Sequence, residues 1–183
     1  MAGILFSCKN DIEEIKALTD DRDLAVQMVE DGVFYYTSKG KLTNRLEATH
    51  LERFESEENA RIEVSGGFTL TLFDSLERED GVLKAMKGTF WDKENRLVAS
   101  EDVELQNKEG DLLETEELIF VQDSDLVYTD KHVTITTKEA IIRGKGLITD
   151  SQFKKRQIKK VTGTLYIDDP IQSDTLNGST QNP

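Results

Sequence analysis

Along most of the chain, apolar and polar residues alternate with the period of two that is typical of β-strands with one buried face. Residues 68–72 read Phe-Thr-Leu-Thr-Leu, so one side of this segment is apolar and the other is polar. The β-rich run at residues 33–36 is followed by a polar turn at residues 38–41 and a second run at residues 42–54, which predicts a hairpin.

A strand-pair unit occurs twice in the second half of the chain. Residues 97–120 read LVASEDVELQNKEGDLLETEELIF and residues 126–149 read LVYTDKHVTITTKEAIIRGKGLIT, with matching apolar positions. The copies recur with a period of about 30 residues, which is typical of stacked supersecondary units. One unit cannot bury its apolar face alone, so neighbouring units are expected to share an elongated core.

Polar turn and loop segments divide the rest of the chain into further strands. Asp80 and Gly81 predict a turn before a strand at residues 82–91, and a last alternating strand is expected around residues 161–167. Short polar loops are expected at residues 92–96, 108–110 and 122–125. Together these segments predict an all-β, antiparallel fold of roughly ten or more strands. We expect an elongated roll in which two sheets fold toward each other and leave open edge strands at both ends.

Composition narrows the classes of function. The chain has 183 residues and a formal charge of −13, which fits one domain and argues strongly against binding a nucleic-acid backbone. Its single cysteine, Cys8, excludes an intramolecular disulfide, and His50 and His132 stand far apart in polar stretches. We therefore expect no catalytic residue, cofactor or metal site. No apolar run approaches the roughly 18 to 20 residues of a transmembrane helix.

Residues 1–8, MAGILFSC, are apolar and small and end in Leu5-Phe6-Ser7-Cys8, the arrangement of a bacterial lipobox. In such a motif the cysteine thiol receives a diacylglycerol group, whose acyl chains hold the protein on a bilayer. No Lys or Arg precedes the stretch, and it is shorter than the about 7 to 15 residues of a signal h-region. A missing upstream segment or a misassigned start would explain both departures, and a short apolar leader with an incidental cysteine is the alternative interpretation.

Beyond this leader, the sequence predicts three further parts. Residues 9–23 are polar and acidic and are expected to be a tether with at most one short helix. Residues 24–169 are expected to form the β body. Residues 170–183 are polar and without period, which predicts a disordered tail.

Several stretches resemble the LptC family of the OstA-like β-jellyroll superfamily. They are NDIEEIKAL at residues 10–18, GKLTNRLEATHLERFE at residues 40–55, FTLTLFDS at residues 68–75, and LETEELIF, DLVYTDKHVTITT and GKGLITD between residues 113 and 150. The repeat motif is specific to the superfamily and fits the soluble bridge protein of the same pathway nearly as well. The anchor-like N-terminus favours LptC.

The resemblance implies a non-enzymatic carrier. Members of the family accept lipopolysaccharide from an inner-membrane ABC transporter, hold its acyl chains inside the jellyroll, and pass it to the next jellyroll of a periplasmic bridge. It therefore implies lipopolysaccharide, the transporter and the soluble bridge jellyroll as partners. The best-known members carry a transmembrane helix where this chain has Cys8, so we expect a periplasmic protein anchored to the inner membrane by a lipidated Cys8 or by a missing upstream segment.

The strand pattern and the resemblance together indicate a lipid trough. An apolar interior stabilises acyl chains by about 0.8 kcal/mol per buried methylene. The candidate lipid-binding residues are Phe68, Leu70, Leu72, Phe90, Val103, Leu105, Leu118, Phe120, Val133 and Ile135. A packed core is the plainer interpretation of any one of these positions, because periodicity does not separate a trough from a core.

A cluster of cations interrupts the acidic chain near its end. Its members are Lys154, Lys155, Arg156, Lys159 and Lys160. They could contact lipid phosphates or an acidic face of a partner protein. The plainer interpretation is that lysines on a terminal strand discourage unwanted strand pairing.

Two other functions fit the sequence. The chain could be a soluble jellyroll of the same bridge, which would lack lipidation at Cys8. It could also be a surface lipoprotein that acts as a glycan-binding or assembly module without handling lipid.

Overall fold

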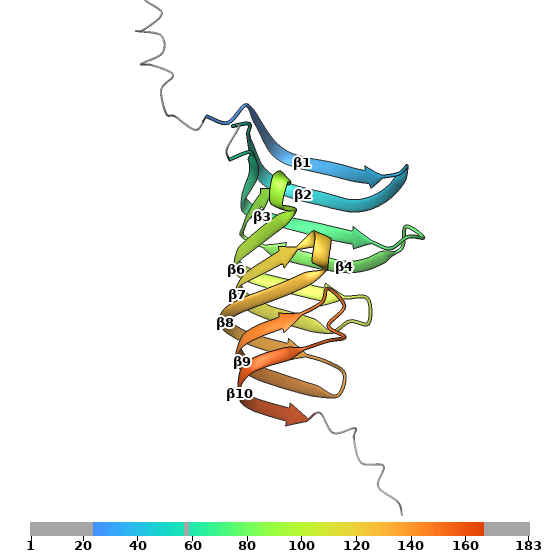
Figure 1. Cartoon of the computed structure of the whole chain (residues 1–183), viewed down its shortest axis with the longest axis vertical. Coiled ribbons are helices and arrows are strands. Elements are labelled where there is room, and N and C mark those ends of the chain that lie inside the picture. Colours follow the sequence, from blue (N-terminus) through green and yellow to red (C-terminus); the bar gives the residue numbers. More distant parts are fainter. Residues whose placement is uncertain (1–23, 57–58, 167–183) are drawn as a thin grey trace, which may run out of the picture.

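The computed structural model describes residues 24–56 and 59–166 and folds them into a single antiparallel sheet, shown in Figure 1. Neighbouring strands follow the order β1-β2-β3-β4-β6-β7-β8-β9-β10, and β5 pairs with both β3 and β6. The strands are β1 (Gln27–Ser38), β2 (Lys41–Phe54), β3 (Arg61–Phe73), β4 (Glu79–Ala85), β5 (Lys87–Trp91), β6 (Arg96–Asn107), β7 (Leu112–Val121), β8 (Leu126–Thr136), β9 (Ala140–Thr149) and β10 (Gln157–Tyr166). The strands stack along the long axis of the molecule, which confirms the predicted all-β, elongated fold.

Local turn chemistry explains where the strands end. Between β1 and β2, Lys39 and Gly40 both have positive φ, at 52° and 78°, as in the mirror-image hairpin turn that matches the twist of the strands. In the repeats, a short 3-10 helix, η1 (Asp92–Glu94) or η2 (Gln122–Ser124), is followed by one left-handed residue before the next strand. An equivalent turn therefore leads into each of the two repeat copies.

The region before β5 differs from the prediction of a turn at Asp80 and Gly81. Gly81 lies inside β4, and the turn comes earlier in the chain. There the Asp74 carboxylate accepts a hydrogen bond from the backbone N–H of Arg78 at 3.0 Å and pairs with its guanidinium group at 2.7 Å. These contacts hold the earlier turn closed, so the Asp-Gly pair continues a strand.

The sheet folds over along a line of irregularities near the middle of the strands. The register shifts between Ser100 and Val103 where β6 pairs with β7, and similar shifts interrupt the β2–β3, β7–β8 and β8–β9 pairs. Met86 divides the predicted strand at residues 82–91 into β4 and β5. Bulges bend a strand and increase its twist, so the two halves of the sheet form layers that face each other.

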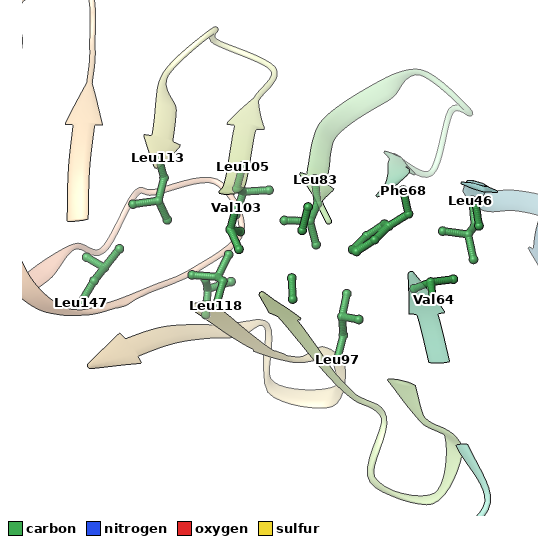
Figure 2. Close-up of a cluster of buried hydrophobic side chains, with 14 of the residues drawn as sticks. Leu46, Val64, Phe68, Leu83, Leu97, Val103, Leu105, Leu113, Leu118 and Leu147 are labelled. Atoms are coloured by element: carbon green, nitrogen blue, oxygen red, sulfur yellow. The ribbon is translucent and has the colours of Figure 1, made fainter. Parts of the chain in front are cut away.

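The buried side chains form one core between these layers (Figure 2). Figure 2 shows Phe68 of β3 and Leu97 of β6 pointing into this core from opposite layers. The most deeply buried side chains include Leu113, Ile135 and Leu147 of β7, β8 and β9, each 0% exposed. Full burial of one such side chain contributes about 1.5 to 3 kcal/mol, so these three strands contribute strongly to the stability of the core.

Candidate functional site

Toward the β1 end of the roll, the two layers enclose an open cavity of about 490 Å³. Strand alternation places apolar side chains from both layers on its walls. The apolar lining residues are Leu46, Ile62, Val64, Phe68, Leu70, Leu72, Phe73, Phe90, Leu97 and Phe120. Among the residues that the structure describes, no charged side chain lines this cavity, although the chain as a whole is acidic.

Polar lining residues stand at strand ends, beside the loops. Tyr36 and Asn44 form a cross-strand pair at one wall, and Asn95 and Gln122 line the opposite wall beside η1 and η2. Burial, and then the nearby Asp92 carboxylate, raise the pKa of the Tyr36 hydroxyl, so it stays neutral at physiological pH. The cavity therefore combines an apolar interior with uncharged hydrogen-bonding groups at its mouth, which suits an amphiphile.

A second hollow, of about 540 Å³, differs in chemistry. Its lining includes Glu47, Asp102 and Glu104 together with Lys84. Carboxylates are strongly hydrated and are costly to cover with an apolar group. Of these two hollows in the described residues, the uncharged cavity is therefore the candidate site for an apolar ligand.

The structure divides the ten candidate lipid-binding residues into two sets of five. Lining the cavity are Phe68, Leu70, Leu72, Phe90 and Phe120, of which Phe68 also belongs to the buried core. Packed into the core, with exposures of 1%, 4%, 2%, 2% and 0%, are Val103, Leu105, Leu118, Val133 and Ile135. The alternation of a strand identifies its inward face, whereas the space between the layers decides which inward residues can meet a ligand.

Sequence reasoning missed several cavity residues, including Leu46, Ile62, Val64 and Leu97. Ile62 and Val64 alternate with the charged and polar residues of β3, the same signal that identified Phe68. Leu97 opens the first repeat copy. Ile62 and Val64 precede the strand that the sequence predicts at residues 68–72, so extending that alternation back to residue 61 would have found both.

A loop that joins β9 to β10 closes the roll beside the cavity. We call residues 150–156 the strap. Its Phe153 side chain is 3% exposed and belongs to the core. The Asp150 carboxylate holds the loop by accepting hydrogen bonds from the backbone N–H groups of Gln152, Lys154 and Lys155 at 3.1, 2.9 and 3.2 Å.

The predicted cation cluster is not confined to a terminal strand. Lys154, Lys155 and Arg156 lie in the strap, and only Lys159 and Lys160 lie on β10. The reason is the Asp150-centred turn, which delays the start of β10 until Gln157. Arg156 lies 4.0 Å from the carboxylate of Asp111, and Lys159 lies 2.5 Å from that of Asp130. The hydrogen bond from Lys159 lowers the pKa of Asp130.

Both ends of the sheet are open within the described residues, as the sequence predicts. The edge strand β1 pairs only with β2, and β10 pairs only with β9. Apolar side chains are exposed on both, with Met28 at 63% and Tyr35 at 64% on β1, and Val161 at 60% and Tyr166 at 74% on β10. Each edge offers unpaired backbone groups to another strand.

Several predictions fall on residues that the structure does not describe. They are the lipobox cysteine Cys8, the tether at residues 9–23 and the tail at residues 170–183. Across residues 24–56 and 59–166, no helix is long and apolar enough to cross a membrane.

Comparisons with known proteins identify the fold and the family. The family model described as LptC, lipopolysaccharide-assembly, LptC-related, matches residues 4–166. Among solved structures, LptH from Pseudomonas aeruginosa, described as the LptA homologous periplasmic component of the lipopolysaccharide transport device, is similar with a TM-score of 0.53. The two chains are 12% identical, and the likeness covers 69% of this chain and 95% of LptH, which shows a shared fold. No curated protein matches the chain.

Proposed function

Since the chain belongs to the LptC-related family of lipopolysaccharide-assembly proteins, we propose that it carries lipopolysaccharide by holding the acyl chains in the open cavity. Membership of this family makes the chain a non-enzymatic component of lipopolysaccharide assembly. The proposal adds a place of binding and a direction of transfer. The chain accepts lipopolysaccharide from an inner-membrane ABC transporter and passes it to a soluble bridge jellyroll.

The observation that carries the proposal is the contrast between the cavity and the rest of the chain. A cavity of about 490 Å³ with apolar walls and no charged lining residue lies in a described chain segment whose surface is rich in carboxylates. Each methylene that enters such a cavity contributes about 0.8 kcal/mol. The uncharged groups of Tyr36 and Asn44 at the mouth can meet the polar part of the same molecule.

The open edges support transfer between proteins. Exposed apolar side chains accompany unpaired backbone groups on β1 and on β10. A strand from a neighbouring jellyroll that pairs with either edge would extend the sheet through backbone hydrogen bonds. The ends of the roll are thus the proposed contacts with the transporter and the bridge protein.

The exposed cations of the strap have a proposed role beside the lipid. Lys154 and Lys155 project from a loop next to the cavity, and Lys160 lies on the edge strand β10. Ammonium groups in these places can contact lipid phosphates or an acidic surface of a partner.

Site-specific photocrosslinking in the cell envelope tests the binding site. A photoreactive amino acid at Phe90 or Phe120 should form adducts with lipopolysaccharide, because both side chains line the cavity. The matched controls are Thr89 and Ile119, which precede them on the same strands and face the opposite side of the sheet. Adducts at the control positions alone, or at none of the four, would contradict the proposal.

We also propose a periplasmic location at the inner membrane, with Cys8 as a lipidated anchor. Membrane fractionation of Cys8→Ala provides the test. The variant should appear in the soluble fraction, because it has lost the thiol that receives the lipid. Unchanged association with membranes would exclude lipidation of Cys8 as the anchor.

A further inference from the structure

The strap spans the gap between the two layers of the folded sheet and joins them. On one layer, Gln152 Nε2 donates a hydrogen bond to Asp80 Oδ2 at 2.7 Å, and Asn107 Nδ2 donates one to the carbonyl of Gln152 at 3.2 Å. On the other layer, the backbone N–H of Ser151 donates to Asp125 Oδ1 at 3.3 Å. The strap is therefore hydrogen-bonded to both layers of the sheet.

These anchors stand directly beside the last lining residues of the cavity. In one layer, Leu72 lines the cavity and pairs with Gly81, the residue that follows the anchor Asp80. In the other layer, Gln122 lines the cavity, and its carbonyl accepts a hydrogen bond from the N–H of the anchor Asp125 at 3.2 Å. The strap thus marks the border between the open cavity and the packed interior.

Phe153 fills the interior at this border. Its side chain is 3% exposed and belongs to the same cluster as Leu113, Ile135 and Leu147, each 0% exposed. The backbone of Phe153 has a φ of 56°, which is uncommon for a residue other than glycine. The hydrogen bonds to the Asp150 carboxylate hold the turn in which it occurs.

We propose that the strap, through Phe153, ends the cavity and so sets the longest apolar chain that the protein can bury. The inference rests on the proposed function and adds to it a residue that selects ligands by chain length. Carbons that fit between the mouth and Phe153 leave water. Carbons beyond that length either stay in water or must displace the side chain of Phe153, whose strap is hydrogen-bonded to both layers.

This arrangement gives a specific dependence of affinity on chain length. About 0.8 kcal/mol per buried methylene corresponds to a roughly fourfold lower Kd for each methylene that enters the cavity. Once the chain reaches the strap, further methylenes gain nothing, so the Kd should stop falling. A plot of log Kd against chain length should therefore show a break.

Titration calorimetry of the full chain with n-alkyl maltosides of increasing length, below their micelle concentrations, tests the inference. The uncharged head group avoids repulsion by the acidic protein. Phe153→Ala should move the break to longer chains, because it opens space within the core cluster to which Phe153 belongs. Phe153→Leu removes less volume and should move the break in the same direction by less, so it serves if the Ala variant does not fold.

Phe54→Ala is the matched control, because Phe54 is a buried aromatic residue, 7% exposed, that does not line the cavity. Its break should coincide with that of the unmodified chain. An unmoved break in every folded Phe153 variant would overturn the role of the strap while leaving lipid binding intact. Absence of maltoside binding to the unmodified chain would instead overturn the cavity as the site of apolar ligands, and the strap as its limit with it.

Discussion

Separate replacement of Leu118 and Leu70 with Ala tests whether the interior is divided into a packed part and an open part. Both side chains face the interior, but Leu118 is 2% exposed within the core, whereas Leu70 is only partly buried and lines the cavity. At Leu118 the change removes buried apolar surface and leaves an enclosed void, which costs about 2 to 5 kcal/mol. At Leu70 the new space joins an existing cavity, so we expect a loss of about 1 kcal/mol or less.

Urea unfolding followed by far-UV circular dichroism measures this difference. For a chain of this size, a loss of about 3 kcal/mol at Leu118 corresponds to a fall of roughly 6 to 12 °C in Tm. The affinity for an apolar ligand should change more in Leu70→Ala than in Leu118→Ala, the reverse of the order expected for stability. Leu70→Ala should weaken the binding of an alkyl maltoside about fivefold for each 1 kcal/mol of lost contact, whereas Leu118→Ala should leave the Kd unchanged.

Equal losses of stability in the two variants would refute the division, because they would place Leu70 in an equally dense environment. A large effect of Leu118→Ala on maltoside affinity would refute it from the other side. That result would mean that the ligand reaches beyond the strap into the interior that the structure shows as packed.

Three further predictions concern charges and close contacts. The protonated His50 ring donates to Glu30 Oε1 at 2.7 Å, which raises the pKa of His50 above its ordinary 6.5; its contribution is full below pH 6.5 and is lost as the pH rises through the raised pKa. The stability lost in His50→Gln should therefore shrink over that range in urea unfolding, and a constant loss would contradict the assignment. Hydrogen bonds from Arg78 lower the pKa of Asp74 from 3.8 to about 2, so its contribution is present above pH 3.8 and is lost as the pH falls through about 2. Asp74→Asn should destabilise the chain at neutral pH but approach the unmodified chain in acid; a difference that persists in acid would argue against it. Gly144→Ala puts a methyl group against Ile158 and 2.7 Å from the carbonyl oxygen of Lys160, which should loosen β10 at a cost of about 1 to 3 kcal/mol. Gly163→Ala, with nothing within 4 Å, is the control, and equal amide exchange of β10 in both variants would contradict the clash.

Most of the strand order could be predicted because its signals are local. The repeat copies at residues 97–120 and 126–149 fold into equivalent hairpins, and an equivalent turn, at η1 or η2, leads into the first strand of each. The hairpin of β1 and β2 follows from Lys39 and Gly40, whose positive φ the turn requires. The turn predicted at Asp80 failed because a competing contact between Asp74 and Arg78 closes the chain earlier.

The division of the interior could not be predicted, because it depends on contacts between distant parts of the chain. The alternation that identifies Phe68 and Leu70 is absent around Phe153, which stands alone in the polar stretch SQFKKR and gives no periodic signal. Its burial follows from hydrogen bonds that join the strap to Asp80 and Asn107. No local pattern in the sequence indicates that these segments meet.

The same division explains how one sheet can stay folded and keep an apolar cavity open. Side chains around an unfilled cavity lack part of their contacts, so the strands that line it contribute less stability than packed strands. Beyond the strap, Leu113, Ile135 and Leu147, each 0% exposed, make those contacts in full. Because β3 connects through β4 and β5 to β6 in one hydrogen-bonded sheet, the packed strands hold the cavity walls in register. A ligand that fills the cavity should therefore protect the amides of β2 and β3 more than those of β8 and β9.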